Sequence, residues 1–314
     1  MSPVPRALAS TGGSMPMRKP RPDLRRIRQA IEDTSGYPYE LDIARRIESC
    51  RDYTYLVEPN YSFEDQDTGQ ARELDFRALE AVPISTKNSE YAFVVILGSC
   101  KANRNPYVFF TRQVPLSGIT LNSDVPIAGC PLEIVDGKGG SEAIEWYFQL
   151  HKFLHIAEMD SVSSQFCEVV WKNGRWEIRS EAIFRDTIIP LIKAMAKEID
   201  AYNRRSAAPG DRLSPDYQIF YPLLVVKGPL LEYYLPAKGP ARLREARQIL
   251  LIRHYESKTV KCRYAIDVVH DSYLHQYLDL VQREVAGFVN RVRHRKRDVL
   301  RSIKHMAEQD QSRS

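Results

Sequence analysis

The chain has 314 residues, 43% of them hydrophobic, and a formal net charge of +5. This length suits one large or two ordinary domains, and the hydrophobic fraction suffices for a packed core. Five cysteines without a CxxC pair argue against a disulfide framework or a zinc cluster. No apolar run is long enough to cross a bilayer and we see no secretory signal, so we expect a cytoplasmic protein without membrane contact.

The N-terminal part of the chain predicts a disordered leader and two helices. Residues 1–22 are rich in Pro, Ser, Gly and Arg and lack hydrophobic periodicity, which is typical of disorder. A first helix is expected after Asp23, which can serve as its N-cap. A second helix follows the helix-breaking sequence 35–38 and carries Glu40 in its first turn. Its predicted inward face consists of Leu41, Ala44, Ile47 and Cys50.

Three strands are predicted next, at 52–63, 71–82 and 91–100. The third is a continuous apolar run, typical of a strand covered on both faces of a sheet. Alternation places Glu73 and Asp75 on one face of the second strand, and Ser99 and Lys101 on one face of the third. The other face of the second strand is predicted to carry Leu74, Phe76, Ala78 and Val82.

The middle of the chain predicts two more helices and a hairpin. Residues 141–157 and 181–203 are expected to be helical, with Pro190 kinking the second helix or marking its true start. A β-hairpin is predicted around Asn173-Gly174, because this dipeptide suits a type I′ turn.

The C-terminal part predicts further strands and one long helix. The strands are expected at 219–226, 230–235, 248–256 and 261–270. The helix begins after residue 271 or 272 and carries an apolar stripe close to a heptad repeat. The stripe consists of Leu274, Leu278, Val281, Val285, Phe288 and Val292.

Acidic and basic residues meet in the first half of this pattern. If the second and third strands are neighbours, the Asp75 carboxylate and the Lys101 ammonium lie together at the end of a buried strand. A carboxylate can hold a hard cation and an ammonium can stabilise a phosphate, so this pair suits phosphodiester cleavage. An ordinary cross-strand ion pair is the alternative interpretation.

Two segments of the chain resemble the core of the PD-(D/E)xK, restriction-endonuclease-like family. These segments are 68–75 and 96–101. In that family one strand bears an acidic residue, and the next bears a second acidic residue followed two positions later by a lysine. Asp75 matches the first acidic position, Lys101 matches the lysine, and Ser99 stands where the family usually has Glu or Asp. The resemblance covers about residues 39–110 and implies an α/β fold with a mixed central sheet flanked by helices.

The resemblance implies a Mg²⁺-dependent nuclease acting on DNA. Asp75 would be a metal ligand, and Lys101 would orient the attacking water or stabilise the phosphate charge. Ser99 would be a degenerate ligand position, because a hydroxyl is a weaker ligand than a carboxylate. Glu40, a first-helix acid of the kind that some family members use, or Glu73, which shares a strand face with Asp75, would be a supplementary metal ligand. A helix-dipole or capping carboxylate is the alternative for Glu40, and a solvated strand acid or a partner of an arginine is the alternative for Glu73.

Basic residues at two places predict contact with nucleic-acid phosphates. Arg104 lies in the loop after the third predicted strand. A C-terminal cluster consists of Arg291, Arg293, Arg295, Lys296 and Arg297. The alternatives for this cluster are a solvated helix end or a homodimer contact through the C-terminal helix.

Other chemistry is poorly supported. Cys100 is expected to be a small buried residue. His151 and His155 could chelate a metal at their i, i+4 spacing, but without an HExxH pattern a structural role is favoured. The glycine-rich sequence 137–140 lacks the spacing of a phosphate-binding P-loop.

The expected organisation has four parts. These are a disordered leader at 1–22, a restriction-endonuclease-like domain with insertions at 23–238, C-terminal strands and a basic helix packed on that core at 239–305, and a disordered tail at 306–314. The function hypothesis is a metal-dependent nuclease weakened by the loss of one acidic ligand. The alternative is a catalytically inactive nucleic-acid-binding or assembly protein that retains the nuclease fold.

Overall fold

The computed structural model describes most of the chain. The described residues are 23–50, 53–87, 90–102, 104–113, 126–135, 140–157, 159–179, 184–206 and 215–313. The predicted leader, most of the glycine-rich loop and Asn103 lie outside them. The first half contains α1 (Leu24–Thr34), α2 (Tyr37–Glu48), β1 (Leu56–Asp65), β2 (Gln70–Ser85), β3 (Glu90–Lys101), β4 (Tyr107–Gln113), β5 (Ile127–Cys130), β6 (Glu133–Val135), β7 (Ser141–Ala143), α3 (Ile144–Tyr147), the 3₁₀ turn η2 (Leu150–Lys152) and α4 (Leu154–Ala157).

The second half supplies the remaining strands and the longest helices. Its elements are β8 (Ser161–Lys172), β9 (Arg175–Arg179), the π-helical turn η3 (Phe184–Ile188), α6 (Ile189–Ser206), β10 (Asp216–Val226), β11 (Leu230–Leu235), β12 (Arg242–Glu245), β13 (Gln248–Glu256), β14 (Lys261–His270), the 3₁₀ turn η4 (Asp271–Tyr273), α7 (Leu274–His294) and α8 (Lys296–Arg313). The four strands predicted in this half are therefore confirmed as β10, β11, β13 and β14, whereas β12 was missed.

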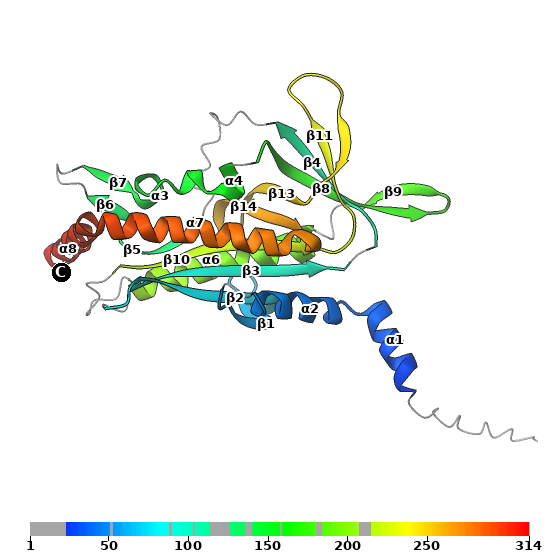
Figure 1. Cartoon of the computed structure of the whole chain (residues 1–314), viewed down its shortest axis with the longest axis horizontal. Coiled ribbons are helices and arrows are strands. Elements are labelled where there is room, and N and C mark those ends of the chain that lie inside the picture. The colour runs from blue at the N-terminus through cyan, green and yellow to red at the C-terminus, as the bar shows by residue number, and fades with distance from the viewer. Residues whose placement is uncertain are drawn as a thin grey trace, which may run out of the picture.

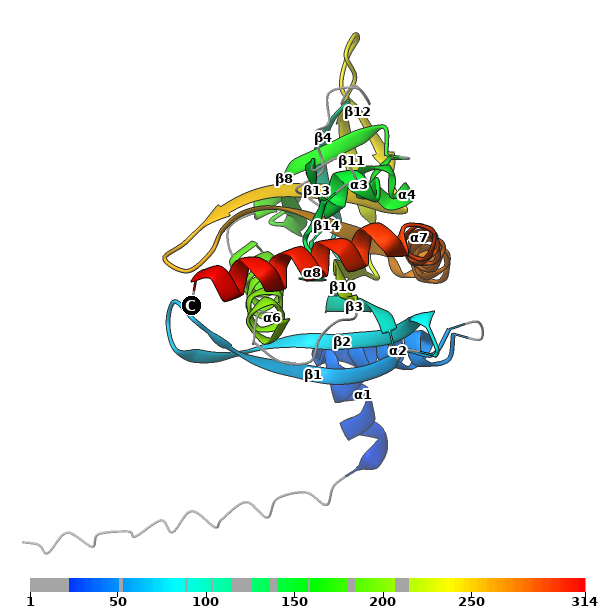
Figure 2. The ribbon, with the colours of Figure 1, turned by 90° about the vertical axis from the view of Figure 1, so that its left-hand side faces the viewer.

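One large mixed sheet organises the molecule (Figure 1). Its strand order is β1-β2-β3-β10-β14-β13-β8-β4-β11-β12, and β5 and β9 attach to β10 and β8. β3, β10 and β14 are mutually parallel at its centre, and antiparallel hairpins β1–β2 and β11–β12 form its two ends. Figure 2 shows the two ends far apart, below and above the central strands. The predicted boundary at 238/239 falls in the β11–β12 hairpin, and β13 and β14 join the same sheet.

Helices cover both faces of the central strands. Alternate residues of β3 enter two separate cores, as expected for a strand buried on both sides. Val94 and Ile96 pack with α2 and α7, whereas Val95 and Leu97 pack with α6. Pro190 lies at the second position of α6, so it marks the start of that helix and does not kink it. The prediction of an α/β fold with a mixed sheet flanked by helices is confirmed.

The long C-terminal helix is confirmed as α7, and its predicted apolar stripe is fully buried in the core of this same chain. A dimer contact through α7 would therefore have to use residues outside the stripe. α7 ends at His294 with Arg295 as its C-cap, whose backbone N–H donates to the carbonyl of Arg291, and α8 begins at Lys296. The tail predicted from residue 306 is helical as far as Arg313. Val299 and Ile303 anchor α8 because both side chains are buried.

Two other helix predictions need correction. Residues 141–157 form short β7, α3, η2 and α4 instead of one helix, because Gln149 adopts a left-handed conformation with φ of 58°. In α2, the buried residues are Tyr39, Ile43, Ala44 and Ile47, whereas Leu41 is 57% exposed. Of the predicted inward face, Ala44, Ile47 and Cys50 are therefore confirmed as buried, and Leu41 is wrong. Among the described residues, no helix is both long and apolar enough to cross a membrane.

A buried polar network joins α4, α7 and the central sheet. The backbone N–H of His155 donates to Glu284 at 2.6 Å, and its ring Nδ1 lies 2.8 Å from the same carboxylate. The Tyr221 hydroxyl donates to Glu284 at 3.2 Å, and the Tyr277 hydroxyl donates to Asp267 at 2.7 Å. His155 Nε2 lies 3.9 Å from Asp267. His155 thus has the structural role predicted for it.

The charge of His155 is set by its two acidic neighbours. Burial lowers the pKa of the imidazole, but the charges of Glu284 and Asp267 outweigh burial and raise the pKa from 6.5 to about 9. Because the folded-state pKa lies above the unfolded value, His155 stabilises the fold fully below about pH 6.5. That contribution is lost as the pH rises through about 9.

We expect His155→Gln to lower the free energy of unfolding by about 3–5 kcal/mol near neutral pH, since it leaves buried carboxylates uncompensated. The parent protein should also lose stability between about pH 7 and about pH 10, and the variant should show less of this loss. Urea unfolding followed by circular dichroism measures both effects. His254→Gln, on an exposed side chain of β13, is the matched control and should change neither.

Candidate functional site

The pairing of β2 with β3 stops where the predicted site begins. The antiparallel register runs from Ser85↔Glu90 to Phe76↔Gly98. Beyond it, the Cys100 backbone N–H donates to Asp75 Oδ2 at 2.5 Å, so a side-chain carboxylate replaces the next strand contact. The Asp75 carboxylate is thereby fixed against the edge of β3.

The faces of β2 change at this position. Phe76 packs in the core with α2 and α7, whereas Leu74 packs in the core with α6. On the neighbouring β1, Asn60 lies between the partners of these two residues and has a φ of 54°. The prediction that Leu74 and Phe76 share a face is therefore wrong. Because the strand turns over at Asp75, its side chain points toward β3 and away from the regular alternation.

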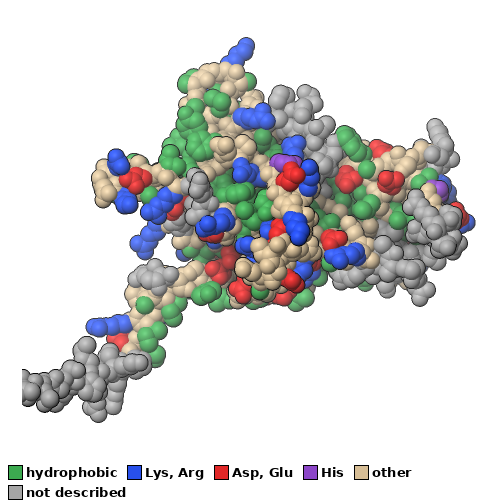
Figure 3. Space-filling model, turned by 180° about the vertical axis from the view of Figure 1, so that it is seen from behind, with side chains coloured by type: hydrophobic (Ala, Val, Ile, Leu, Met, Phe, Trp, Pro, Cys, Tyr) green, Lys and Arg blue, Asp and Glu red, His purple; other side chains and the backbone are tan. Residues whose placement is uncertain are grey.

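Three of the predicted acids line one open pocket of about 550 Å³ at the start of α2. These acids are Glu40, Glu73 and Asp75. A side chain at Gly36 would put its Cβ 2.8 Å from Glu40 Oε1, so the glycine leaves room for that carboxylate. Figure 3 shows acidic side chains gathered where the projecting α1 meets the body of the molecule.

The charges in this pocket act on one another. Burial raises the pKa of the Glu40 carboxyl, the Asp75 charge raises it further, and Lys101 opposes the rise. Burial also raises the pKa of Asp75, against the Cys100 hydrogen bond and the charge of Lys101. In the described part of the chain, no carboxylate lies within 4.0 Å of the Lys101 ammonium. The structure therefore brings Glu40, Asp75 and Lys101 within electrostatic reach without a direct ion pair.

The other residues predicted for the metal site contribute less to the acidic pocket. Ser99 is only 5% exposed and does not line the pocket. Across the described residues, no three His, Cys, Asp or Glu side chains come together so as to hold a metal ion. Glu73 thus shares the pocket without completing a three-acid group with Glu40 and Asp75. Cys100 is a buried free cysteine, as predicted, and burial raises the pKa of its thiol well above the ordinary value.

Sequence reasoning missed one acidic residue that interacts electrostatically with Lys101. Asp186, in the π-helical turn before α6, hydrogen-bonds Arg185, and this bond lowers the pKa of its carboxyl. The charges of Lys101 and Arg72 lower it further, so this carboxyl is within electrostatic reach of Lys101. Asp186 is far from Lys101 in sequence and carries no motif, so only the fold could reveal this contact.

Most side chains of the C-terminal basic cluster contact other residues of the folded chain. Lys296 Nζ lies 2.8 Å from the buried carboxylate of Glu90, and Arg293 donates to the carbonyl of Ile84 at 2.9 Å. Burial lowers the pKa of Arg291. Arg295 lies over the ring of Tyr147. Arg297 is exposed, and among the described residues it has no such partner.

The cluster and the acidic pocket lie at opposite ends of β3. Glu90, which holds Lys296, is the first residue of this strand and Lys101 is the last. At 3.3 Å per residue the separation is about 36 Å. Figure 1 shows α8 and α1 at opposite ends of the molecule. The exposed Arg104, in the connection to β4, lies at the pocket end. The C-terminal cluster therefore does not form one surface with the acids, whereas Arg104 lies at their end of β3.

Searches of protein-family models, curated proteins and solved structures found no match to this chain.

We expect Glu40→Gln and Asp75→Asn to stabilise the fold at neutral pH, by about 1–3 °C in Tm. Both carboxyls have a raised pKa in the folded state, so both destabilise it once ionised. The gain should vanish as the pH falls below the ordinary values of 3.8 for Asp75 and 4.5 for Glu40. Thermal unfolding across this pH range is the measurement. Glu64→Gln, on an exposed position of β1, should leave Tm unchanged, and an equal rise there would contradict the explanation.

Proposed function

We propose that this protein is a Mg²⁺-dependent nuclease-like protein that acts on DNA, built on a restriction-endonuclease-like core. The core would comprise α2 followed by β1, β2 and β3, which occur in the order that the resembled family requires. Asp75 lies at the end of the β2–β3 pairing and Lys101 at the end of β3, which agrees with the places of the family's acid and lysine.

One observation carries the proposal. Glu40 and Asp75 are two partly buried carboxylates that repel each other, in an open pocket beside a lysine. Such repulsion is costly to a fold and is relieved by a bound cation. Two carboxylates that repel each other, with no ion-pair partner among the described residues, are therefore better explained by a cation-binding site than by a contribution to stability.

The residues present fit a magnesium ion. Mg²⁺ is usually held by one or two carboxylates together with waters and substrate phosphates, so a third protein acid is not required. Glu40 and Asp75 would hold it, with Glu73 available at the rim of the pocket. When bound, Mg²⁺ supplies Lewis-acid polarisation of a phosphate and lowers the pKa of a water.

The chain's own groups would orient and stabilise the reacting phosphate. The Cys100 N–H fixes one oxygen of Asp75, leaving the other oxygen free to act as a ligand. The Lys101 ammonium, which has no carboxylate within 4.0 Å among the described residues, would stabilise negative charge developing on the phosphate. Arg104 would contact a flanking phosphate of the DNA backbone.

A specific observation favours a second candidate, a DNA-binding protein that does not cleave. Ser99 occupies the second acidic position and is buried away from the pocket. A two-carboxylate centre holds Mg²⁺ less tightly than a three-carboxylate centre, because fewer negative charges neutralise the charge of the ion. In this candidate, the same pocket and Lys101 would contact the DNA backbone without hydrolysis.

Plasmid incubated with the protein and Mg²⁺ should be nicked or cut, and Asp75→Asn and Lys101→Met should each lower the rate by at least about 100-fold. Mg²⁺ should also raise the Tm of the parent protein but not that of Asp75→Asn, which tests binding without activity. Lys238→Met, exposed near the β11–β12 turn, is the control for removal of a charge. Salt-sensitive DNA binding without cleavage, unchanged in Asp75→Asn, would favour the second candidate.

The C-terminal cluster should add sequence-independent affinity only. Replacing Arg295 and Arg297 by Gln should reduce the slope of log K against log salt by about 0.9 for each phosphate that the variant no longer neutralises. Cleavage of a duplex too short to span β3 should remain unchanged, because the cluster lies at the far end of that strand. Fluorescence anisotropy at several salt concentrations checks the slope. An unchanged slope would remove the cluster from DNA binding.

A further inference from the structure

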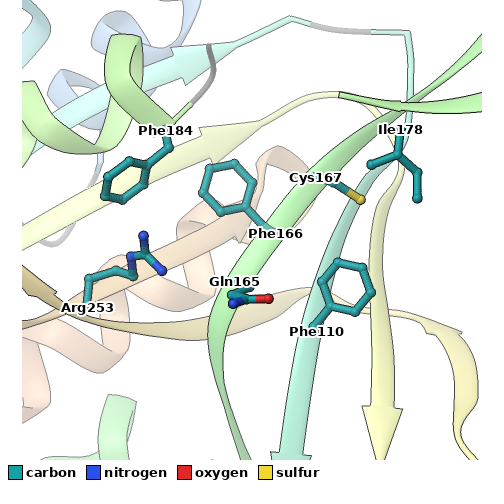
Figure 4. A pocket seen from close by; sticks show the side chains of 7 residues that line it. All are labelled: Phe110, Gln165, Phe166, Cys167, Ile178, Phe184 and Arg253. Atoms are coloured by element: carbon teal, nitrogen blue, oxygen red, sulfur yellow. The ribbon is translucent and has the colours of Figure 1, made fainter. Parts of the chain in front are cut away.

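The outer part of the sheet contains a notch between β8 and β13. In the described residues these two parallel strands pair only at Leu251↔Ser163. Further along, β8 pairs on this side with β9, beginning at Glu168↔Arg179. The strands therefore separate between these points, and a pocket of about 550 Å³ opens in the gap (Figure 4). This size is ordinary for a small-molecule site.

The walls of the notch are aromatic and aliphatic. Phe166 and Phe184 stand on one side, and Phe110 and Ile178 stand on the other, as Figure 4 shows. Phe110 is 38% exposed and Ile178 is 68% exposed. Phe166 is itself held in place by stacking on Phe109, with ring centroids 4.9 Å apart. These side chains offer flat apolar surfaces that suit a planar ring.

Arg253 supplies a cation that lacks a counter-ion. Its guanidinium lies 4.2 Å from the centre of the Phe184 ring, and one terminal nitrogen donates to the carbonyl of Ser164 at 2.5 Å. Its Nε is buried without a hydrogen-bond acceptor. No carboxylate in the described part of the chain lies within 4.0 Å of it. A guanidinium in this state is a ready partner for a phosphate or carboxylate.

Gln165 is a second polar side chain that lines the pocket. Its side chain is exposed and lies between Arg253 and Phe110 in Figure 4. An amide offers both donors and an acceptor, so it can meet the edge of a nucleobase. Aromatic walls, one amide and one guanidinium without an acidic neighbour in the described residues together match a ring that carries both polar edges and an acidic group.

We propose that this notch binds a nucleotide, with the base between the phenylalanine rings and the phosphate on Arg253. The nucleotide would come either free from solution or as an unpaired unit of a DNA strand, and the strand source rests on the proposed function. Position supports the strand source. Phe184 belongs to the same turn as Asp186, whose carboxyl responds to the charge of Lys101. The notch therefore shares η3 with a carboxyl that interacts electrostatically with Lys101.

The test uses the full chain, deoxynucleoside monophosphates measured by calorimetry, and a fluorescently labelled single-stranded oligonucleotide measured by anisotropy. Arg253→Gln should weaken binding about tenfold or more, because a charge-assisted hydrogen bond is removed. Phe184→Ala should weaken it by a similar factor, because the base loses a stacking surface. Arg253→Lys keeps the charge and should retain part of the affinity. Arg242→Gln, on the exposed β12, is the control and should bind as the parent does.

The outcomes separate the possibilities. Binding of the monophosphates, sensitive to Arg253→Gln, establishes a free-nucleotide site, and binding of the oligonucleotide alone establishes a strand site. No binding of either probe, or equal binding by Arg253→Gln with an unchanged Tm, overturns the inference. Asp75→Asn should abolish cleavage without changing nucleotide affinity. Absence of nuclease activity would thus not contradict nucleotide binding in the notch. Absence of nucleotide binding would likewise not contradict the proposed nuclease activity.

Discussion

The candidate site depends on the contact between the Asp75 carboxylate and the Cys100 N–H. This bond takes the place of a strand pair, so β2 turns over beside β3 and sends Leu74 and Phe76 into different cores. A carboxylate anchored through one oxygen keeps a fixed position while its other oxygen stays available. Glu40 comes to the same pocket from the first turn of α2, where Gly36 leaves it space. The acids converge because the first turn of α2 lies beside the part of β2 where its pairing with β3 stops.

The sequence predicted much of this framework, because hydrophobic patterning is strong where strands and helices are buried. β3, α7 and the hairpin turn at Asn173-Gly174 all follow that rule. Patterning failed where the backbone leaves regular geometry, as at Asp75 and at Gln149, whose left-handed conformation ends a helix. It also missed Asp186, which approaches Lys101 through the fold alone.

The basic residues near the C-terminus show why charge in a sequence is a weak guide to surface. Five cations within seven positions indicated a phosphate-binding patch. In the fold, Lys296 neutralises buried Glu90, Arg293 caps a carbonyl of β2, and Arg291 is partly buried. Arg253 is the opposite case, since it stands isolated in the sequence but lacks an acidic neighbour within 4.0 Å among the described residues. What matters for recognition is whether a cation already has a partner.

The single paired position between β8 and β13 has a consequence for the dynamics of the molecule. Strands β8, β4, β11 and β12 share long ladders with one another but join the inner sheet through Leu251↔Ser163. Cooperative units in proteins separate where few backbone bonds cross. We therefore expect the amide protons of the outer strands to exchange with solvent faster than those of β3, β10 and β14, while Phe109 and Phe166 keep the outer strands packed in the core that contains α6.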